Sequence, residues 1–297
     1  MSVLMDRLDD DMLKRCASYL APEEMVSLGR VARRFGLPGS SLPDSSLVET
    51  VAGDVFAQAA TEEERLALPR YDHESSICLY KQLVLMRTPL EFNQLIGEDV
   101  FHSPSWPKSR VCVDGGHGGT NWNCVISSSV MRGGRHFAKF GINVSVDGYV
   151  TNVGDIRNVT VGVIRPISGW DDRGIENFFP SIIDSTDSVS HDLLAERTTT
   201  WHGDIHCCSY YCWGGSCCRT DWYTQSIDDW AGQEDLRLPS TIGLLLDLVE
   251  GSLSVYKNGR KLGIMASGLK GEYCWFASMA DENGSVCIER AALPEIG

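Results

Sequence analysis

The hydrophobic residues of this chain follow two different periods, one before about residue 100 and one after it. From Met5 onward, apolar residues recur every three or four positions, which is the spacing of one helix face. The first stripe comprises Met5, Leu8, Met12, Leu13, Cys16 and Leu20. Asp9 or Asp10 is expected to cap this helix, because a carboxylate accepts from the free amides of a first turn.

Further helices are expected in the same region. Pro22 begins the second helix, at a position where no amide donor is needed. Residues 36–39, Gly-Leu-Pro-Gly, end it. Helical spacing resumes over residues 48–60, 61–67 and 75–86. The pattern therefore predicts a helical region over residues 1–100.

Past Phe101 the period becomes two, which is typical of strands with one buried face. Many short strands with almost no helix between them imply a sandwich of antiparallel sheets. Pro104 and Pro107 interrupt regular structure, so the boundary is placed at residues 102–108 and the sandwich at 105–293. The expected strands are residues 110–113, 124–130, 136–144, 159–164, 205–213, 242–248, 253–256 and 273–279.

The clearest local signal is residues 244–265, LLLDLVEGSLSVYKNGRKLGIM. An apolar strand turns back at Glu250-Gly251, and an alternating strand follows it. Asn258-Gly259 supplies the left-handed backbone of a two-residue hairpin turn. This stretch predicts a meander of three strands.

The same residues, TIGLLLDLVEGSLSVYKNGRKLGIM, resemble the signature of the SPRY domain family. Three further stretches agree in order: MRGGRHFAKFGI (131–142), VTVGVIRPI (159–167) and GEYCWFASM (271–279). The resemblance covers residues 107–291. It implies a bent sandwich of two antiparallel sheets that binds protein ligands through loops at one end, without catalysis. Residues 137–140 lack the family's usual Trp and Glu, so partner preferences do not transfer.

The N-terminal stretch DRLDDDMLKRCASYLAPEEMVSLGRVARRFG (6–36) resembles an F-box. Val31, Arg33, Arg34 and Phe35 carry the last part of that pattern, while Arg7-Leu8 replaces its usual Leu-Pro opening. An F-box implies docking to the linker protein of a cullin-type ubiquitin ligase, with the SPRY domain choosing substrates. The alternative is an ordinary helical hairpin that packs on the helices after it. Both interpretations stay open.

Charge and composition narrow the class of partner. The 297 residues carry a net charge of −14 and no block of lysine or arginine, which argues against nucleic acid and anionic membranes as partners. Neither a signal peptide nor a membrane-spanning run is evident in the sequence. The chain is expected in the cytoplasm or nucleus, with its eleven cysteines mostly reduced.

Residues 202–218, HGDIHCCSYYCWGGSCC, hold five cysteines and two histidines. A two-residue turn at Gly214-Gly215 would place Cys212 opposite Cys217. Three interpretations stay open: inert buried thiols, a reversible Cys212–Cys217 disulfide, and a metal site. The expectation is no metal and no cofactor, and the alternative function is a metal- or redox-dependent protein using this cluster.

The sequence shows no arrangement typical of an enzyme. The glycine-rich run at residues 114–120 lacks the Gly-Lys-Ser/Thr ending of a phosphate loop and is interpreted as an inter-strand loop. No activated nucleophile is evident. The expected function is therefore non-covalent recognition of a protein or peptide.

Aromatic and arginine side chains are the usual anchors of protein interfaces. Those in loops of the expected sandwich are candidates for partner binding, although several could instead fill its core. A binding site requires that they converge on one exposed patch. The candidates are Trp122, Arg165, Trp170, Asp171, Arg173, Tyr211 and Trp213.

Overall fold

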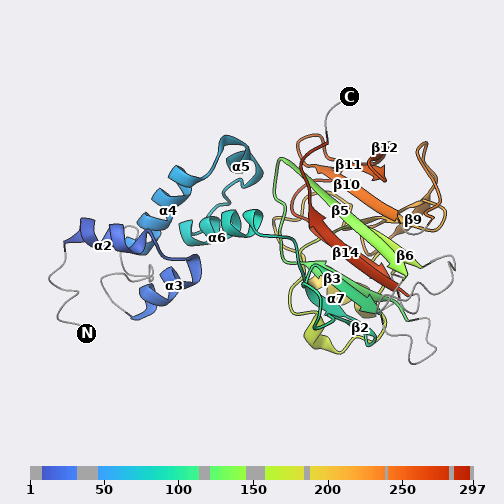
Figure 1. Ribbon diagram of the computed structural model, residues 1–297, viewed down its shortest axis with the longest axis horizontal. Coiled ribbons are helices and arrows are strands. Elements are labelled where there is room, and N and C mark those ends of the chain that lie inside the picture. The colour runs from blue at the N-terminus through green and yellow to red at the C-terminus, as the bar shows by residue number, and fades with distance from the viewer. Residues whose placement is uncertain are drawn as a thin grey trace. The chain divides into compact units, whose positions relative to one another are not determined.

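The computed structural model describes residues 9–31, 46–113, 121–144, 158–183, 188–237, 240–280 and 284–294 (Figure 1). Its contacts divide the chain into two compact units, Met1–Thr88 and Pro89–Gly297. Within the described ranges, no helix is long and apolar enough to cross a membrane.

The first unit is helical, as the spacing of apolar residues predicts. Asp9 caps the first described helix by accepting from the Met12 amide at 2.8 Å. Thr61 and Glu64 form a reciprocal capping box at the start of the helix Glu62–Ala67. Each side chain accepts a hydrogen bond from the backbone amide of the other residue. The described helices are α2 (Asp10–Ala17), α3 (Pro22–Val31), α4 (Leu47–Ala59), α5 (Glu62–Ala67) and α6 (Ser76–Arg87).

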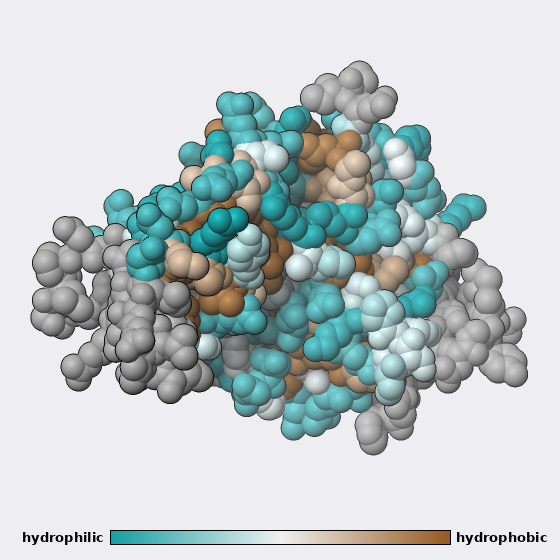
Figure 2. Space-filling model, turned by 60° about the vertical axis from the view of Figure 1, so that its left-hand side comes forward, coloured by the Kyte–Doolittle hydropathy of each residue, from teal (hydrophilic) through white to brown (hydrophobic). Residues whose placement is uncertain are grey.

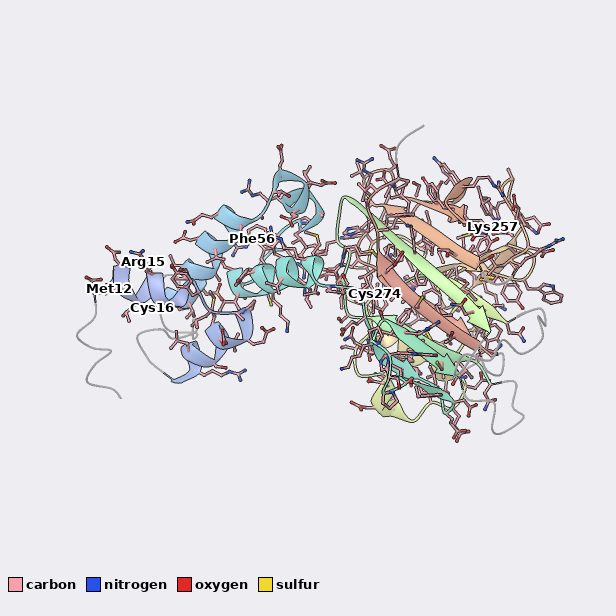
Figure 3. All side chains as sticks on the ribbon, in the orientation of Figure 1. Met12, Arg15, Cys16, Phe56, Lys257 and Cys274 are labelled. Carbon is pink, nitrogen blue, oxygen red and sulfur yellow. The ribbon has the colours of Figure 1, made fainter. Side chains whose placement is uncertain are left out.

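The helical unit has its own hydrophobic core, built from α2, α3, α4 and α6. The opposite side of α2 stays exposed and carries the side chains of Met12, Arg15 and Cys16, which are labelled in Figure 3. The F-box-like pattern lies only partly in the described chain, because Leu8 and residues 32–36 are outside it. The core residues of this unit are Leu13, Ala17, Met25, Val48, Val51, Ala52 and Ile77.

The second unit is a sandwich of two antiparallel seven-stranded sheets, which confirms the expected fold class. We call them sheet A and sheet B. In order across sheet A, the strands are β1 (Phe92–Ile96), β4 (Asn123–Ser127), β13 (Cys274–Met279), β6 (Val159–Ile164), β7 (Cys207–Tyr211), β8 (Cys217–Thr220) and β9 (Gln225–Asp228). Sheet B runs β12 (Arg260–Ser267), β11 (Ser252–Lys257), β10 (Ser240–Asp247), β5 (Arg135–Val144), β14 (Gly284–Arg290), β3 (Arg110–Val113) and β2 (Val100–Phe101).

The central strands β4, β13 and β6 of sheet A are buried on both faces, because the segment between β6 and β7 covers their outer face. Successive residues of a strand point to opposite faces, and Val163 and Trp275 accordingly pack in the core between the sheets. Their neighbours Ile164 and Phe276 pack in a second core with residues of the covering segment. That segment contains a 3₁₀ turn, η2 (Asp171–Arg173), and the helix α7 (Ser188–Ala195).

The structure divides the chain earlier than the boundary expected at residues 102–108. Phe92–Ile96 forms β1 and pairs with β4, so the sandwich begins well before Pro104. Phe92 and Ile96 fill the two separate cores on either face of sheet A. Their four-residue spacing is compatible with a helix, and only the pairing with β4 makes the segment a strand.

The expected meander is confirmed. β10 pairs with β11 and β11 with β12, all antiparallel. Asn258 and Gly259 have φ angles of 51° and 82°, as a two-residue turn with left-handed backbone requires. The strands β1, β2, β9 and β14 and the helix α7 were not expected from the pattern.

Candidate functional site

Large hydrophobic side chains are exposed at scattered positions in both units. Figure 2 shows hydrophobic residues in separate areas of one face, with hydrophilic residues between them. Exposure alone therefore does not identify a binding site. The local geometry around each exposed side chain must show whether it could belong to one. The exposed ones are Met12, Tyr19, Leu66, Phe101, Trp213, Tyr223, Ile227, Val249 and Ile264.

The loop between β7 and β8 differs from the two-residue turn expected at Gly214-Gly215. The Tyr211 amide donates to the Ser216 carbonyl at 2.9 Å, so residues 212–215 form a four-residue loop. The register pairs Cys217 with Tyr210, so Cys212 and Cys217 do not face each other as a two-residue turn would require. Gly214 and Gly215 both have positive φ, and the Gly215 amide closes the loop on the Tyr211 carbonyl at 2.9 Å.

The cysteines of this region are free and lie on both faces of sheet A. Cys208, Cys212 and Cys217 belong to the core between the sheets, whereas Cys207 belongs to the outer core. The nearest approach is 4.0 Å, between Cys208 Sγ and Cys217 Sγ, which is a contact and not a bond. Burial raises the pKa of the Cys218 thiol to about 12, which keeps it protonated.

No group of His, Cys, Asp and Glu residues suited to hold a metal ion occurs in the part of the chain that the structure describes. The alternation of faces gives the reason, since neighbouring thiols of β7 and β8 point into different cores. The metal-dependent alternative therefore has no support from this cluster. The glycine-rich run at residues 114–120 lies outside the described residues.

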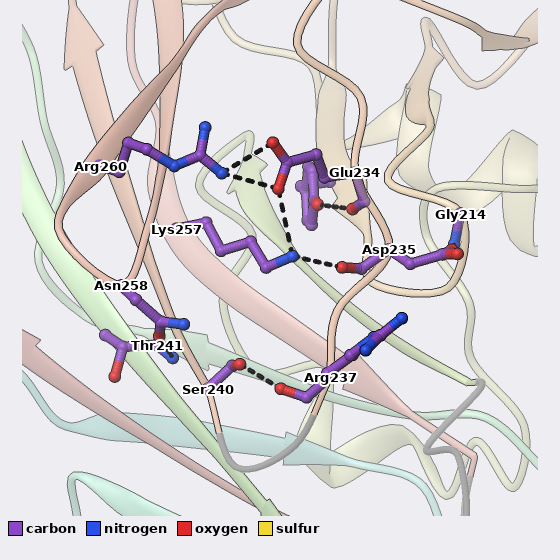
Figure 4. A network of polar contacts seen from close by, with 10 residues as sticks. Gly214, Glu234, Asp235, Arg237, Ser240, Thr241, Lys257, Asn258 and Arg260 are labelled. Carbon is purple, nitrogen blue, oxygen red and sulfur yellow. Dashed lines mark hydrogen bonds and ion pairs between the residues drawn. The ribbon is translucent and has the colours of Figure 1, made fainter.

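The β7–β8 loop is held in place by a segment that follows β9 (Figure 4). The Gly214 amide donates to Asp235 Oδ1 at 2.7 Å, and the Leu236 amide donates to the Cys212 carbonyl at 3.0 Å. Trp230 Nε1 donates to the Gly215 carbonyl at 2.7 Å. These bonds attach both halves of the loop to a second piece of chain, and the loop is well anchored as a result.

The anchoring segment is in turn fixed to the hairpin of β11 and β12. Arg260 Nη2 lies 2.7 Å from Glu234 Oε1, and Lys257 Nζ lies 3.3 Å from Glu234 Oε2 (Figure 4). The Arg260 bond, together with Lys257, lowers the pKa of Glu234 and keeps it ionised. The Tyr210 hydroxyl donates to the Glu234 carbonyl. One short segment thus links both sheets beneath the loop.

Trp213 projects from this anchored loop and is 53% exposed. Its indole meets the half-buried Tyr211 ring edge-on, with 6.4 Å between the ring centroids. A second aromatic pair lies at the same end of sheet A, where β4 begins. There the Trp122 ring stacks on Phe179 with centroids 3.7 Å apart and planes 3° from parallel.

Strand register shows that both pairs belong to one end of the sheet. Asn123 of β4 lies opposite Met279 of β13, and Met279 lies opposite Val159 of β6. The Cys212 amide donates to the Val159 carbonyl at 2.9 Å, which brings the end of β7 into the same row. We call the four side chains Trp122, Phe179, Tyr211 and Trp213 the aromatic end of sheet A.

Two expected binding residues, Arg165 and Trp170, are buried and do not belong to an exposed patch. Arg165 lies just past the other end of β6, and its Nη1 donates to the carbonyls of Lys270 at 2.7 Å and Glu272 at 3.0 Å. Its guanidinium stacks over Tyr273, 4.2 Å from the ring centroid. Because the covering segment folds over sheet A, a loop arginine becomes a buried donor to the carbonyls of that segment and of the chain before β13.

Trp170 is only 1% exposed and packs against Phe178 in the outer core. Asp171 and Arg173 follow in η2 and are exposed. Arg173 is engaged inside the unit, since its guanidinium pairs with Glu196 and stacks on Trp170 at 4.3 Å. The candidates thus separate into an aromatic end and an internal cluster around η2, and the expected single patch is not formed.

One member of the aromatic end, Phe179, was missed from the sequence. It follows a Phe178 that is buried, and nothing in the sequence FFP distinguishes the two rings. The bond from the Phe178 amide to the Trp122 carbonyl at 2.8 Å places Phe179 against Trp122. The two residues are more than 50 positions apart in the sequence, so no local sequence pattern indicates that they are in contact.

No protein-family model and no curated protein matches the sequence. Among solved structures, the chain is similar to the SPRY domain of human HERC1, with 14% identity and a TM-score of 0.40 over 69% of this chain and 99% of that one. It is also similar to the PSpry domain of TRIM65, with 14% identity and a TM-score of 0.41 over 69% of this chain and 93% of that one.

A third similar structure is the carbohydrate-binding module CBM66 from Bacillus subtilis. The identity is 7% and the TM-score is 0.33, over 60% of this chain and 81% of that one. All three TM-scores lie under 0.5, and no function of these domains is carried over to this chain.

Proposed function

We propose that this protein is a non-catalytic recognition module whose β-sandwich binds a segment of a partner protein at the aromatic end of sheet A. The observation that carries the proposal is Trp213, a large side chain 53% exposed on a loop that is anchored by several hydrogen bonds. Burying such a ring against a partner removes apolar surface from water.

The anchoring matters because association costs the entropy of every group that must be ordered. The loop backbone is already fixed through Asp235, Leu236 and Trp230, so little further ordering is needed. Trp122 and Tyr211 are half-buried and their rings already pair with neighbours, which leaves partly exposed rigid faces. Rigid aromatic side chains of this kind dominate binding energy in protein interfaces.

The experiment compares the intact chain with Trp213→Ala and with Tyr223→Ala. Tyr223 is a matched control, because it is 70% exposed in the turn at the opposite end of β8. Proteins captured from the source cells are quantified by mass spectrometry, and binding of the purified partner is then measured by calorimetry. We expect Trp213→Ala to weaken partner binding by about thirtyfold, as for a 2 kcal/mol hot spot, and Tyr223→Ala to leave it unchanged. Equal binding by both variants contradicts the proposal.

We also propose that the helical unit docks on the linker protein of a cullin-type ubiquitin ligase, which would make the chain a substrate-recognition adaptor. The resemblance of residues 6–36 to an F-box supports this role. So does the exposure of two large side chains around α2, Met12 at 55% and Tyr19 at 79%. Neither residue is needed for the core of the unit.

Co-purification of the intact chain with the ligase linker subunit tests the adaptor role. The Met12→Asp and Tyr19→Asp variants are expected to lose the linker. The control is Leu66→Asp, since Leu66 is 69% exposed on α5 of the same unit. Failure of the unaltered chain to bind the linker would remove this role and leave the recognition function untouched.

A further inference from the structure

The four outer strands of the two sheets differ in how their free edges are protected. A free edge exposes unpaired N–H and C=O groups, and proteins usually shield such edges with bulges, charges or covering chain. In sheet B, β2 has only two residues. The pairing of β12 with β11 contains two register shifts, and Gly232 crosses β12 so closely that an added Cβ would lie 2.4 Å from the Leu262 carbonyl oxygen.

In sheet A, β1 is protected in the same manner. In the part of the chain that the structure describes, β9 has acidic neighbours but no bulge, and no covering segment is hydrogen-bonded to its outer side. The pairing of β1 with β4 has a register shift, and the Gln94 side chain is bonded to the Ile167 carbonyl and the Trp170 amide of the covering segment. β9 pairs with β8 over four consecutive residues without any shift. It is the last strand in the order of its sheet.

The direction of the free backbone groups on β9 follows from its hairpin. The Asp221 amide donates to the Thr224 carbonyl at 3.2 Å, so these two residues form the first bonded pair. Bonded and non-bonded pairs alternate along an antiparallel ladder. Arg219–Ser226 and Cys217–Asp228 are therefore bonded pairs. Gln225 and Ile227 consequently turn their N–H and C=O groups away from β8, toward the open edge.

The side chains of this edge have a defined character. Ile227 is 58% exposed, an unusual position for a large apolar side chain on a free edge. Acidic residues flank it along the chain: Asp228 and Asp229 follow it directly, and Asp221 precedes the strand. The nearby cationic side chain of Arg219 already forms an ion pair with Asp228.

A polar cavity of about 150 Å³ lies beside the start of β9. Two carboxyl residues, Asp204 and Asp221, line it together with Ser226. A lysine or arginine side chain that entered this cavity would meet negative charge and hydroxyl acceptors. The remaining lining residues are Ile205, Arg219, Thr220, Thr224 and Gln225.

We propose that β9 is a docking edge for an extended segment of a partner protein in which basic residues alternate with apolar ones. The segment adds an eighth strand to sheet A through the backbone groups of Gln225 and Ile227. One of its apolar side chains covers Ile227, and a basic side chain faces Asp204 and Asp221. A second copy of this chain is disfavoured as the occupant, because residues 221–229 contain no lysine or arginine that could face Asp204 and Asp221.

This docking edge is independent of the aromatic end. The probe is a fluorescein-labelled peptide of about six alternating lysine and valine residues, the length of an average strand. Its binding to the intact chain is followed by fluorescence anisotropy. We expect it to bind at least about tenfold more tightly than a peptide with glutamate in place of lysine. N-methylation of alternate peptide amides is expected to weaken binding about tenfold, because it removes the donors to β9.

Two protein variants complete the test. Ile227→Pro removes the outward N–H and replaces the branched isoleucine side chain with a compact ring, without breaking a bond to β8. It is expected to weaken peptide binding about tenfold or more. Ile227→Val and Trp213→Ala are expected to bind as the unaltered chain does. The proposal is overturned if the lysine and glutamate peptides bind alike, or if N-methylation has no effect. It is also overturned if size-exclusion chromatography shows a dimer that Ile227→Pro dissociates, since a second copy would then occupy the edge.

Discussion

Replacing Arg165 with methionine should destabilise the sandwich strongly although the residue lies in a loop. Its guanidinium is fully buried and donates to three backbone carbonyls, those of Lys270, Glu272 and His202. Methionine has a similar length and fills most of the same volume, so the cavity term is small. The main cost is therefore that these three carbonyls lose the hydrogen bonds that Arg165 donates to them.

The magnitude follows from the number of acceptors. A buried carbonyl left without a donor costs about 1–3 kcal/mol. Three carbonyls give a loss of about 3 kcal/mol at the lower end, and the contact with Tyr273 adds to it. Arg173→Met is the matched control, because Arg173 is partly exposed and its ion pairs with Glu196 and Asp192 are worth about 1 kcal/mol or less.

The assay is urea unfolding followed by tryptophan fluorescence. All eight tryptophans lie after residue 88, so this signal reports the sandwich unit and not the helices. We expect a loss of about 3 kcal/mol in the free energy of unfolding for Arg165→Met and about 1 kcal/mol for Arg173→Met. If Arg165→Met costs no more than Arg173→Met, the guanidinium does not serve the buried carbonyls in the way described.

Three further predictions concern stability and reactivity. Burial lowers the pKa of His136 and of His206 to about 4. Between pH 6.5 and 4 the unfolded chain therefore binds protons that the folded chain does not, and the stability of the sandwich should fall as pH falls through this window, by up to about 3 kcal/mol per histidine. A urea midpoint that does not change between pH 6.5 and 4 contradicts this prediction. Gly215→Ala should destabilise more than Gly214→Ala in the same urea assay: both have positive φ, but an added Cβ at Gly215 meets the Glu234 carbonyl oxygen at 2.4 Å, while at Gly214 the nearest atom is 3.8 Å away. An equal loss of stability in the two variants would show that Gly215 does not lie this close to Glu234 in solution. Finally, a thiol reagent such as Ellman's should modify the exposed Cys16 and Cys78 rapidly in the native protein and Cys207, Cys208 and Cys212 only on unfolding, as tryptic mass mapping can check. Rapid native modification of β7 would contradict its burial.

Some elements of this protein can be predicted from neighbouring residues alone. The alternation of residues 253–256 and the Asn258-Gly259 pair specify a strand and a turn without reference to distant chain, because both depend on backbone preferences of neighbouring residues. The same holds for Asp9 and Thr61, which cap helices through amides three residues away. Local periodicity was therefore enough to predict the helical unit, most strands and the antiparallel sandwich.

The candidate site depended on contacts between residues far apart in the sequence. Arg165 and Trp170 sit in a segment rich in turn residues, yet the path of that segment over sheet A buries both. Asp235 and Leu236 set the length of the β7–β8 loop from outside it, which is why Cys212 does not face Cys217. Phe179 reaches Trp122 only because the covering segment returns to the start of β4.

By itself, the sequence determined which segments are helix or strand and that the strands form antiparallel sheets, because these depend on periodicity and on backbone preferences of adjacent residues. Only the tertiary structure decided which aromatic and arginine side chains are exposed, because burial depends on which distant segment covers a face. Trp213 and Trp170 look alike in the sequence, and they differ because one lies on an anchored loop at the end of the sheet and the other lies beneath the segment that closes its outer face.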